Sequence, residues 1–278
     1  MNPYPHSPFA GLYEPLTEDM AKKYLARMGF EGKVTPSLSS LTELQTCQLR
    51  SVPFENLEPF HQRREPSLAT ADLYRKIVLE KRGGYCFELN GLFLKLLCAL
   101  GFSAHAVLCR LLFGRDYPNP PAHQASIIPL DGTSYFCDVG FGGPVPAAPM
   151  PLLPDREFTD PAGRLYVFTE KAGLYTLFIR KGEAWDPLMS FFNTPCDPSE
   201  FIPFNTFCAM GALGTPFPKT QMLWRGLPQG RISLDGDLLR ETVDGKTVET
   251  RITTDAALRE ALKKHFGIRF DLPFHPWH

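Results

Sequence analysis

One cysteine in this 278-residue chain stands where a nucleophile could be activated. The segment "KRGGYCFELNG", residues 81–91, places Cys86 after two glycines and at the predicted start of a helix. Unpaired N–H groups and the positive end of the helix dipole favour a thiolate at such a position. Glycines lack side chains, so a second molecule could approach the sulfur closely. A buried core thiol fits the same segment, so the choice depends on whether the chain also supplies a base.

His123 is the histidine best placed for that role, because it opens the predicted hairpin "HQASIIPLDGTSYFCDVG". If the Asp-Gly pair at 131–132 forms a two-residue turn, Ala125 lies opposite Asp138. His123 lies two residues from Ala125 and therefore on the same face, diagonal to Asp138. A shift of one residue would put the two side chains on opposite faces. The hairpin thus predicts a base and an orienting acid, as a nucleophilic cysteine requires.

Composition and charge argue against several classes of protein. A hydrophobic content of 44% is ordinary for a globular protein, and a net charge of −1 gives no general attraction to nucleic acid. The seven cysteines are odd in number and form no C-x-x-C pair. We therefore expect neither a disulfide framework nor a metal site built on thiolates.

The N-terminal segment "MNPYPHSPFAGLYEPL" lacks the basic start and apolar run of a signal peptide. The longest apolar segment, "GLFLKLLCALGF", contains Lys95 and is too short to span a bilayer. The expectation is a cytoplasmic protein that does not act at a membrane.

Three regions must position the cysteine, the histidine and the acid. Residues 1–100 predict helices at 17–30, 40–51, 70–84 and 89–100, from apolar residues at helical spacing. Residues 101–182 predict strands and hairpins. Residues 183–278 begin with an irregular Pro- and Phe-rich stretch, continue with Asp-Gly hairpins and end in the helix "TDAALREALKKHFG". The pattern indicates an α+β protein.

The motifs "RGGYCFELNGLF", "VPFENLEPF" and "DVGFGG" together resemble the arylamine N-acetyltransferase family, in the same order and spacing over about residues 17–270. The resemblance implies a Cys-His-Asp triad, and the matching positions are Cys86, His123 and Asp138. It also implies that the three regions are an N-terminal helical bundle with the nucleophile, a central β-barrel with the His and Asp, and a C-terminal α/β lid. The triad then lies between the first two.

The family's reaction is ping-pong acyl transfer from acetyl-CoA, through an acetyl-Cys86 thioester, to the nitrogen of an arylamine, hydrazine or N-hydroxyarylamine. His123 is expected to take the thiol proton, and Asp138 to hold the imidazole in the correct tautomer. The expected partners are acetyl-CoA, as a substrate rather than a bound cofactor, and small aromatic amines or hydrazines. The sequence does not determine the oligomeric state, and a homo-oligomer is one of the alternatives.

Two further pairs of residues lie in these motifs. Phe54 and Phe141 match positions that line the acceptor pocket, where flat aromatic walls complement an aryl substrate. Arg82 and Glu55 are expected to form an ion pair that braces the turn before Cys86, although separate surface roles are an equal alternative.

The resemblance also points to residues that contact CoA. Gly142 and Gly143 could allow its close approach, and Asn205 and Thr206 resemble a lid segment that contacts CoA in some relatives. Phe207 stands where the family often has tyrosine, so the preferred acyl donor stays open.

Three other functions fit the same residues. A Cys-His-Asp hydrolase or transglutaminase-like enzyme would use the same triad with another acyl donor. An amide synthase of this fold would take a carrier-bound polyketide. A non-enzymatic protein that binds small aromatic molecules would merely bury Cys86.

Overall fold

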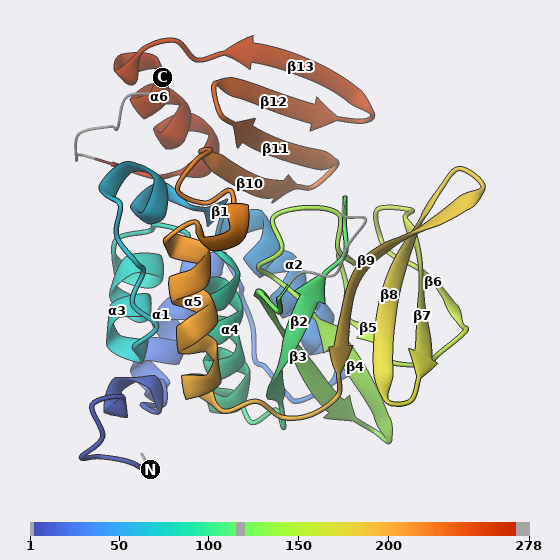
Figure 1. Ribbon diagram of the computed structural model, residues 1–278. Helices are drawn as coiled ribbons and strands as arrows, with labels where there is room; N and C mark the ends of the chain where they lie inside the picture. Colours follow the sequence, from blue (N-terminus) through green and yellow to red (C-terminus); the bar gives the residue numbers. More distant parts are fainter. Residues whose placement is uncertain (1–2, 115–119, 271–278) are drawn as a thin grey trace.

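The structure, a computed structural model, describes residues 3–114 and 120–270 and has three layers (Figure 1). Helices form one side, an eight-stranded sheet the other, and a smaller sheet with a helix lies above both. The α+β class and the order of bundle, barrel and lid are therefore confirmed. The ends of the predicted first and third regions, residues 1–2 and 271–278, lie outside the described residues.

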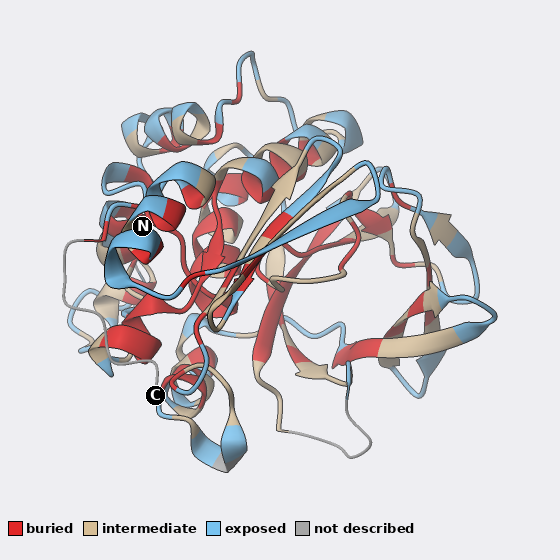
Figure 2. Ribbon diagram, turned by 90° about the horizontal axis from the view of Figure 1, so that it is seen from above, coloured by how far each residue is buried: buried red, intermediate tan, exposed pale blue. Residues whose placement is uncertain are grey.

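The helical bundle packs apolar faces around the central helix α4 (Cys86–Ala99), most of whose residues are buried. Figure 2 shows buried residues, in red, gathered toward the middle of the molecule and exposed ones toward its outside. Thr17 begins α1 by accepting a hydrogen bond from the Met20 N–H, and Gly29 ends it in the left-handed conformation, with φ 69°. The four helices are α1 (Glu18–Met28), α2 (Leu38–Ser51), α3 (Thr70–Tyr74) and α4 (Cys86–Ala99). Short 3-10 and π segments complete the bundle: η1 (Ala10–Leu12), η2 (Glu58–Gln62) and η3 (Arg75–Leu79).

The eight-stranded sheet is antiparallel, in the order β5-β4-β3-β2-β9-β8-β7-β6. A bridge between Pro154 and Phe168 joins the segment after β5 to β7, so the sheet nearly closes into a barrel. Its strands are β2 (His105–Leu111), β3 (His123–Leu130), β4 (Thr133–Cys137), β5 (Met150–Pro151), β6 (Glu157–Thr159), β7 (Leu165–Lys171), β8 (Leu174–Lys181) and β9 (Ala184–Phe192). Strand β9 begins at Ala184, so this sheet extends beyond residue 182, where the sequence suggested that the second region ends.

The lid contains a five-stranded antiparallel sheet, in the order β1-β10-β11-β12-β13. Its edge strand β1 comes from the helical region, because Phe54 pairs with Trp224 and Glu55 with Leu223. The elements are β1 (Phe54–Glu55), β10 (Met222–Leu227), β11 (Gly230–Asp235), β12 (Leu238–Val243), β13 (Lys246–Arg251), α6 (Asp255–Ala261) and η6 (Leu262–Phe266).

Helix α5 (Ile202–Ala209) lies in the stretch that the sequence indicated as irregular. Phe201 precedes it without a capping side chain, and Pro203 occupies its first turn, where a missing N–H costs no helical hydrogen bond. Such a helix carries little sequence signal. It lies between η4 (Pro198–Phe201) and η5 (Ala212–Gly214).

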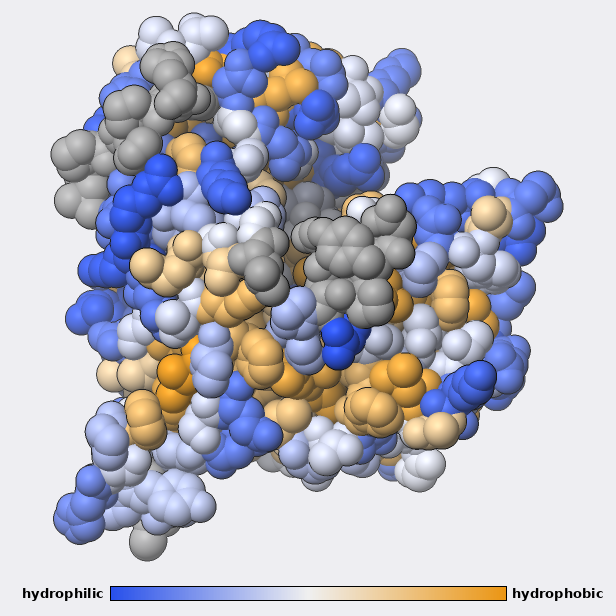
Figure 3. Space-filling model, viewed as in Figure 1, coloured by the Kyte–Doolittle hydropathy of each residue, from blue (hydrophilic) through white to orange (hydrophobic). Residues whose placement is uncertain are grey.

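Hydrophobic side chains gather on the face shown in Figure 3, between the helical bundle and the barrel. No helix within residues 3–114 and 120–270 has the length and apolar character needed to cross a membrane.

Candidate active site

The hairpin of β3 and β4 adopts the predicted register, with Leu130 paired to Thr133. Asp131 and Gly132 both have positive φ, 48° and 79°, as a two-residue turn of this hand requires. The turn chemistry therefore fixed which residues face each other further along the two strands.

The consequence of this register is that His123 Nε2 lies 2.6 Å from Asp138 Oδ2, with both side chains buried. The other oxygen, Oδ1, accepts hydrogen bonds from the Gly140 N–H at 2.8 Å and the Asn90 amide at 2.9 Å. A carboxylate that only accepts requires the proton on Nε2, so Nδ1 keeps a lone pair. The geometry therefore leaves Nδ1 of the imidazole able to accept a proton.

Asn90 was not singled out from the sequence, although it lies one helical turn after Cys86 on the same face of α4. Besides Asp138, its Nδ2 donates to the Gln124 carbonyl at 2.6 Å, and its Oδ1 accepts from the Val139 N–H at 2.9 Å. The sequence signal that could have identified Asn90 was its spacing of four residues from Cys86. Asn90 therefore connects α4, which carries Cys86, to the β3–β4 hairpin, which carries His123.

Cys86 is the first residue of α4 and is 3% exposed, with Sγ donating to the Ala122 carbonyl at 3.7 Å. Burial raises the pKa of its thiol well above the ordinary value, although hydrogen bonds from the backbone N–H groups of Phe87 and Gln124 act in the opposite direction. The helix terminus thus favours the thiolate as expected, but burial outweighs it. A nearby base is therefore needed to remove the proton.

The two glycines of the opening motif have a different role from the one suggested by the sequence. A Cβ on Gly83 would overlap the Pro53 carbonyl, and one on Gly84 would lie 2.8 Å from the Glu88 side chain. Both glycines are buried, and neither lines the cavity at Cys86. They allow close packing of the turn, so the expectation that they open a path to the sulfur is wrong.

Arg82 and Glu55 form the expected pair behind this turn, with Nη2 and Nε at 2.6 and 2.9 Å from Oε1. Burial alone would raise the pKa of Glu55, but the charges of Arg82 and Lys76 outweigh it and lower that pKa. For Arg82, burial acts to lower the pKa, but the charge and hydrogen bond of Glu55, together with the charges of Glu58 and Glu88, raise it overall. The pair is therefore charged inside the protein.

Lys76 and Glu88 continue this network toward α4, with Nζ 2.6 Å from Oε1. The other Glu88 oxygen accepts from the Tyr85 N–H at 3.0 Å, which caps the helix that Cys86 begins. Burial raises the pKa of Glu88 to about 7, against the charge of Lys76.

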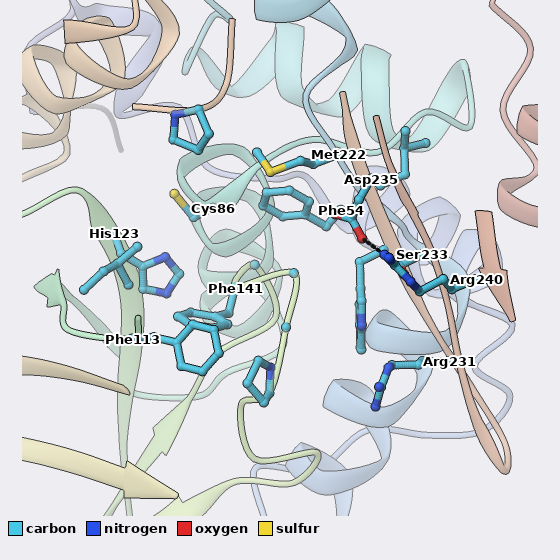
Figure 4. Close-up of a pocket in the computed structure, with 18 of the residues that line it drawn as sticks. Phe54, Cys86, Phe113, His123, Phe141, Met222, Arg231, Ser233, Asp235 and Arg240 are labelled. Atoms are coloured by element: carbon cyan, nitrogen blue, oxygen red, sulfur yellow. Dashed lines mark hydrogen bonds and ion pairs between the residues drawn. The ribbon is translucent and has the colours of Figure 1, made fainter. Parts of the chain in front are cut away.

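A cavity of about 600 Å³ opens onto Cys86 and His123 and is bounded by the bundle, barrel and lid. Figure 4 shows Phe54, Phe113 and Phe141 facing it around the thiol and imidazole. Phe54 and Phe141 therefore lie where the motifs predicted, whereas Phe113 was not anticipated. The aromatic walls of this cavity are Phe54, Phe113, Phe141, Phe217 and Trp224.

The predicted glycines Gly142 and Gly143 also line this cavity. Gly142 has φ +69°, and a Cβ there would lie 2.7 Å from the Phe54 ring. Gly142 thus lets the loop after β4 pack directly on an aromatic wall of the cavity.

The far end of the cavity is polar and comes from the lid. Arg240 is held by Asp235 at 3.3 Å and Glu249 at 2.9 Å, and Arg231 lies nearby on β11 (Figure 4). These residues carry no local motif, which is why the sequence did not reveal them. The polar lining consists of Arg231, Ser233, Asp235, Arg240, Thr242 and Thr247.

Asn205 and Thr206 are not among the residues that line this cavity. The Asn205 amide donates to Glu65 at 2.7 Å and to the Pro66 carbonyl at 2.9 Å, and its oxygen accepts from the Tyr85 hydroxyl. Thr206 donates to the same Glu65 carboxylate at 2.9 Å. Both residues attach α5 to the bundle.

Comparison with known proteins finds relatives along most of the chain. A family profile described as N-acetyltransferase matches residues 37–274. An Escherichia coli arylamine N-acetyltransferase is 29% identical over 251 residues, which are 89% of this chain and 88% of the relative.

Two solved structures have the same architecture. The arylamine N-acetyltransferase of Salmonella typhimurium has a TM-score of 0.86 and 26% identity, covering 91% of this chain and 92% of that one. The Mycobacterium marinum enzyme, solved in complex with CoA, has a TM-score of 0.81 and 26% identity, covering 89% and 92%. In sequence and in structure, the chain belongs to the arylamine N-acetyltransferase family.

Proposed function

We propose that this enzyme transfers an acetyl group from acetyl-CoA through Cys86 to the nitrogen of an arylamine, hydrazine or N-hydroxyarylamine. The observation that carries the proposal is the aromatic-walled cavity onto which Cys86 and the Asp138-oriented His123 both open. A flat apolar cavity accommodates an aryl ring, and a thiol with an adjacent base accepts an acyl group.

In the first half-reaction, His123 Nδ1 accepts the Cys86 proton, and the thiolate attacks the carbonyl carbon of the acetyl-CoA thioester. The bond from that carbon to the CoA sulfur breaks, and the imidazolium returns its proton to CoA as it leaves. Asp138 stabilises the imidazolium and keeps its orientation. The product is acetyl-Cys86.

In the second half-reaction, the amine nitrogen attacks the carbonyl carbon of acetyl-Cys86, and the carbon–sulfur bond breaks. His123 accepts the proton of the attacking amine and passes it to the departing Cys86 thiolate. Weakly basic arylamines are neutral near pH 7, so their lone pair is already available and a modest general base is sufficient.

CoA as donor is supported by the M. marinum relative, which was solved with CoA bound. In this chain the polar end of the cavity offers Arg231, which is exposed and forms no ion pair with any residue that the structure describes. We place an anionic group of CoA there, since a free guanidinium binds phosphate well. Asn205 and Thr206 would contact CoA only if it extended beyond this cavity.

Seven free cysteines are consistent with the proposed cytoplasmic location, because free thiols persist in reducing compartments.

The deciding experiment is to mix the protein with acetyl-CoA, without an acceptor, and to measure intact mass and released CoA. We expect one acetyl group per chain, mapped to Cys86, and one equivalent of CoA. Cys86→Ser should abolish both, whereas Cys98→Ser, which removes an exposed thiol, should leave them unchanged. Acylation by a carrier-bound acyl group but not by acetyl-CoA would favour an amide synthase, and no acylation at all would refute the proposal.

A further inference from the structure

A second cavity, of about 240 Å³, lies beside α4 and β2 and shares no lining residue with the first. Its walls are mainly apolar and come from the bundle, from β2 and from the segment before α5. It is large enough for a substituted benzene ring, because a cavity of about 150 Å³ holds benzene. The main apolar walls are Leu68, Leu73, Phe87, Leu94 and Phe201.

Gln124 gives this cavity a specific polar group. Gln124 is only 4% exposed and lines the cavity, yet its side-chain amide forms no hydrogen bond with the residues that the structure describes. Neither amide atom is among the fully buried side-chain atoms that lack a partner, so both face the cavity and can form hydrogen bonds with a molecule that occupies it. The Gln124 amide therefore indicates a ligand that both accepts and donates.

The other polar groups around the cavity are already engaged. Lys95 Nζ donates to the carbonyls of Leu12 and Glu14 at 2.7 and 3.1 Å. His105 Nε2 lies 3.0 Å from the Asn193 amide oxygen. A neutral ligand therefore fits better than a charged one, because no free charge faces it and burial of a charge is unfavourable.

Gly91 keeps the space beside Gln124 open. It lies in the middle of α4, where glycine is less favourable than alanine. A Cβ there would lie 3.9 Å from both polar atoms of the Gln124 amide and 3.9 Å from Leu73, which is ordinary contact. The backbone thus tolerates a side chain, and its absence leaves the amide accessible from the cavity.

We propose that this second cavity binds a small neutral aromatic molecule with a primary carboxamide. Its ring lies among the apolar walls, and its amide forms paired hydrogen bonds with Gln124, because each amide has one carbonyl acceptor and two N–H donors. Phe87 and Gln124 directly follow Cys86 and His123 in the chain, so the occupant lies next to the proposed catalytic residues without entering their cavity. The binding itself does not depend on the proposed acetyltransferase activity.

Alkylation of cysteines locates the ligand, because Cys196 lines the second cavity and Cys86 the first. Benzamide is the probe, and iodoacetamide labelling of each cysteine is followed by peptide mass spectrometry. We expect saturable protection of Cys196, at least threefold at the highest benzamide concentration. Protection of Cys86 alone, or of neither cysteine, would overturn the proposal.

Two variants test the contacts. Gly91→Ala should weaken the protection of Cys196 at least fivefold, because its methyl group occupies the space beside the amide. Gln124→Met should remove the advantage of benzamide over toluene, which has the ring without the amide. Equal protection by benzamide and toluene in the wild type, or unchanged protection in a folded Gly91→Ala protein, would contradict the proposal. Circular dichroism confirms folding of each variant.

Discussion

Replacing Asn90 by alanine tests whether the link between α4 and the hairpin positions the proposed catalytic groups. The change removes three buried hydrogen bonds, to the Gln124 carbonyl, the Val139 N–H and the Asp138 carboxylate. Strand β4 stops pairing at Cys137, so the Gln124 carbonyl lies beyond the reach of that strand and depends on Asn90. The variant thus leaves buried main-chain groups without partners.

The expected cost to stability follows from those two main-chain groups. An unpaired buried carbonyl or N–H costs about 1–3 kcal/mol, so Asn90→Ala should lower the free energy of unfolding by about 2–6 kcal/mol. The expected cost to catalysis follows from Asp138, which keeps its hydrogen bonds to His123 and Gly140. Loss of about 1.5 kcal/mol of transition-state stabilisation would slow acetylation roughly tenfold.

The assay is single-turnover acetylation of Cys86 at saturating acetyl-CoA, followed by intact mass, together with urea unfolding. Asn56→Ala is a matched control, because Asn56 is equally buried, at 1% exposure, and also makes three hydrogen bonds. It attaches the lid rather than the hairpin, so we expect a similar loss of stability with a rate within threefold of wild type. If both variants acetylate equally fast, Asn90 has only a structural role and the reasoning fails.

Further predictions concern the base, the buried ion pair and the polar end of the cavity. His123→Ala should slow single-turnover acetylation roughly 10²–10⁴-fold, because the buried thiol then lacks a base; acetylation at the wild-type rate would exclude His123 as the base. Glu55→Ala should lower the free energy of unfolding by about 3–5 kcal/mol in urea, since it leaves Arg82 charged and unpaired, whereas Arg82→Met combined with Glu55→Leu should recover much of the loss. The folded pKa of Glu55 lies below its ordinary value of 4.5, so the stabilisation it provides should be complete above pH 4.5 and lost as pH falls through the lower folded pKa. In urea unfolding at a series of pH values, the free energy of unfolding of Glu55→Gln should therefore fall less steeply at acid pH than that of the wild type. Arg231→Ala should raise the KM for acetyl-CoA roughly two- to fivefold in steady-state kinetics, whereas Arg251→Ala, outside the cavity lining, should not; equal effects would remove Arg231 from the donor site.

The position of the proposed base could be predicted because it depends on local chemistry. The Asp131-Gly132 turn permits a single register, and that register determines which side chains share a face with His123. The start of α4 at Cys86 likewise follows from residues beside it, since Glu88 caps the helix by accepting from the N–H of Tyr85, three residues before it. Such relations lie within about 20 residues of sequence, and turn and capping rules describe them.

The packing around these residues could not be predicted in the same way. A two-residue strand such as β1 pairs with β10 only because the bundle and lid meet there, and neither segment specifies the other. The same holds for Gly83, whose lack of a side chain matters only because the Pro53 carbonyl lies against it. In the sequence, Asn90 has the pattern of an ordinary polar helix residue. Its role depends on the end of β4 at Cys137, because the Gln124 carbonyl then has no strand partner there and accepts from Asn90 instead.

The cavity itself shows why the chemistry was more predictable than the substrates. The proposed nucleophile and base come from one helix and one hairpin, whereas the cavity walls come from all three layers. Phe54 lies on the strand that joins the bundle to the lid, so it contacts both the Gly142 loop near the thiol and Phe217 of the lid region. A change in how the lid packs would therefore alter substrate preference without moving His123 or Asp138. Acceptor specificity in this chain should thus respond to substitutions in the lid, while the rate of Cys86 acetylation should respond to substitutions in α4 and the hairpin.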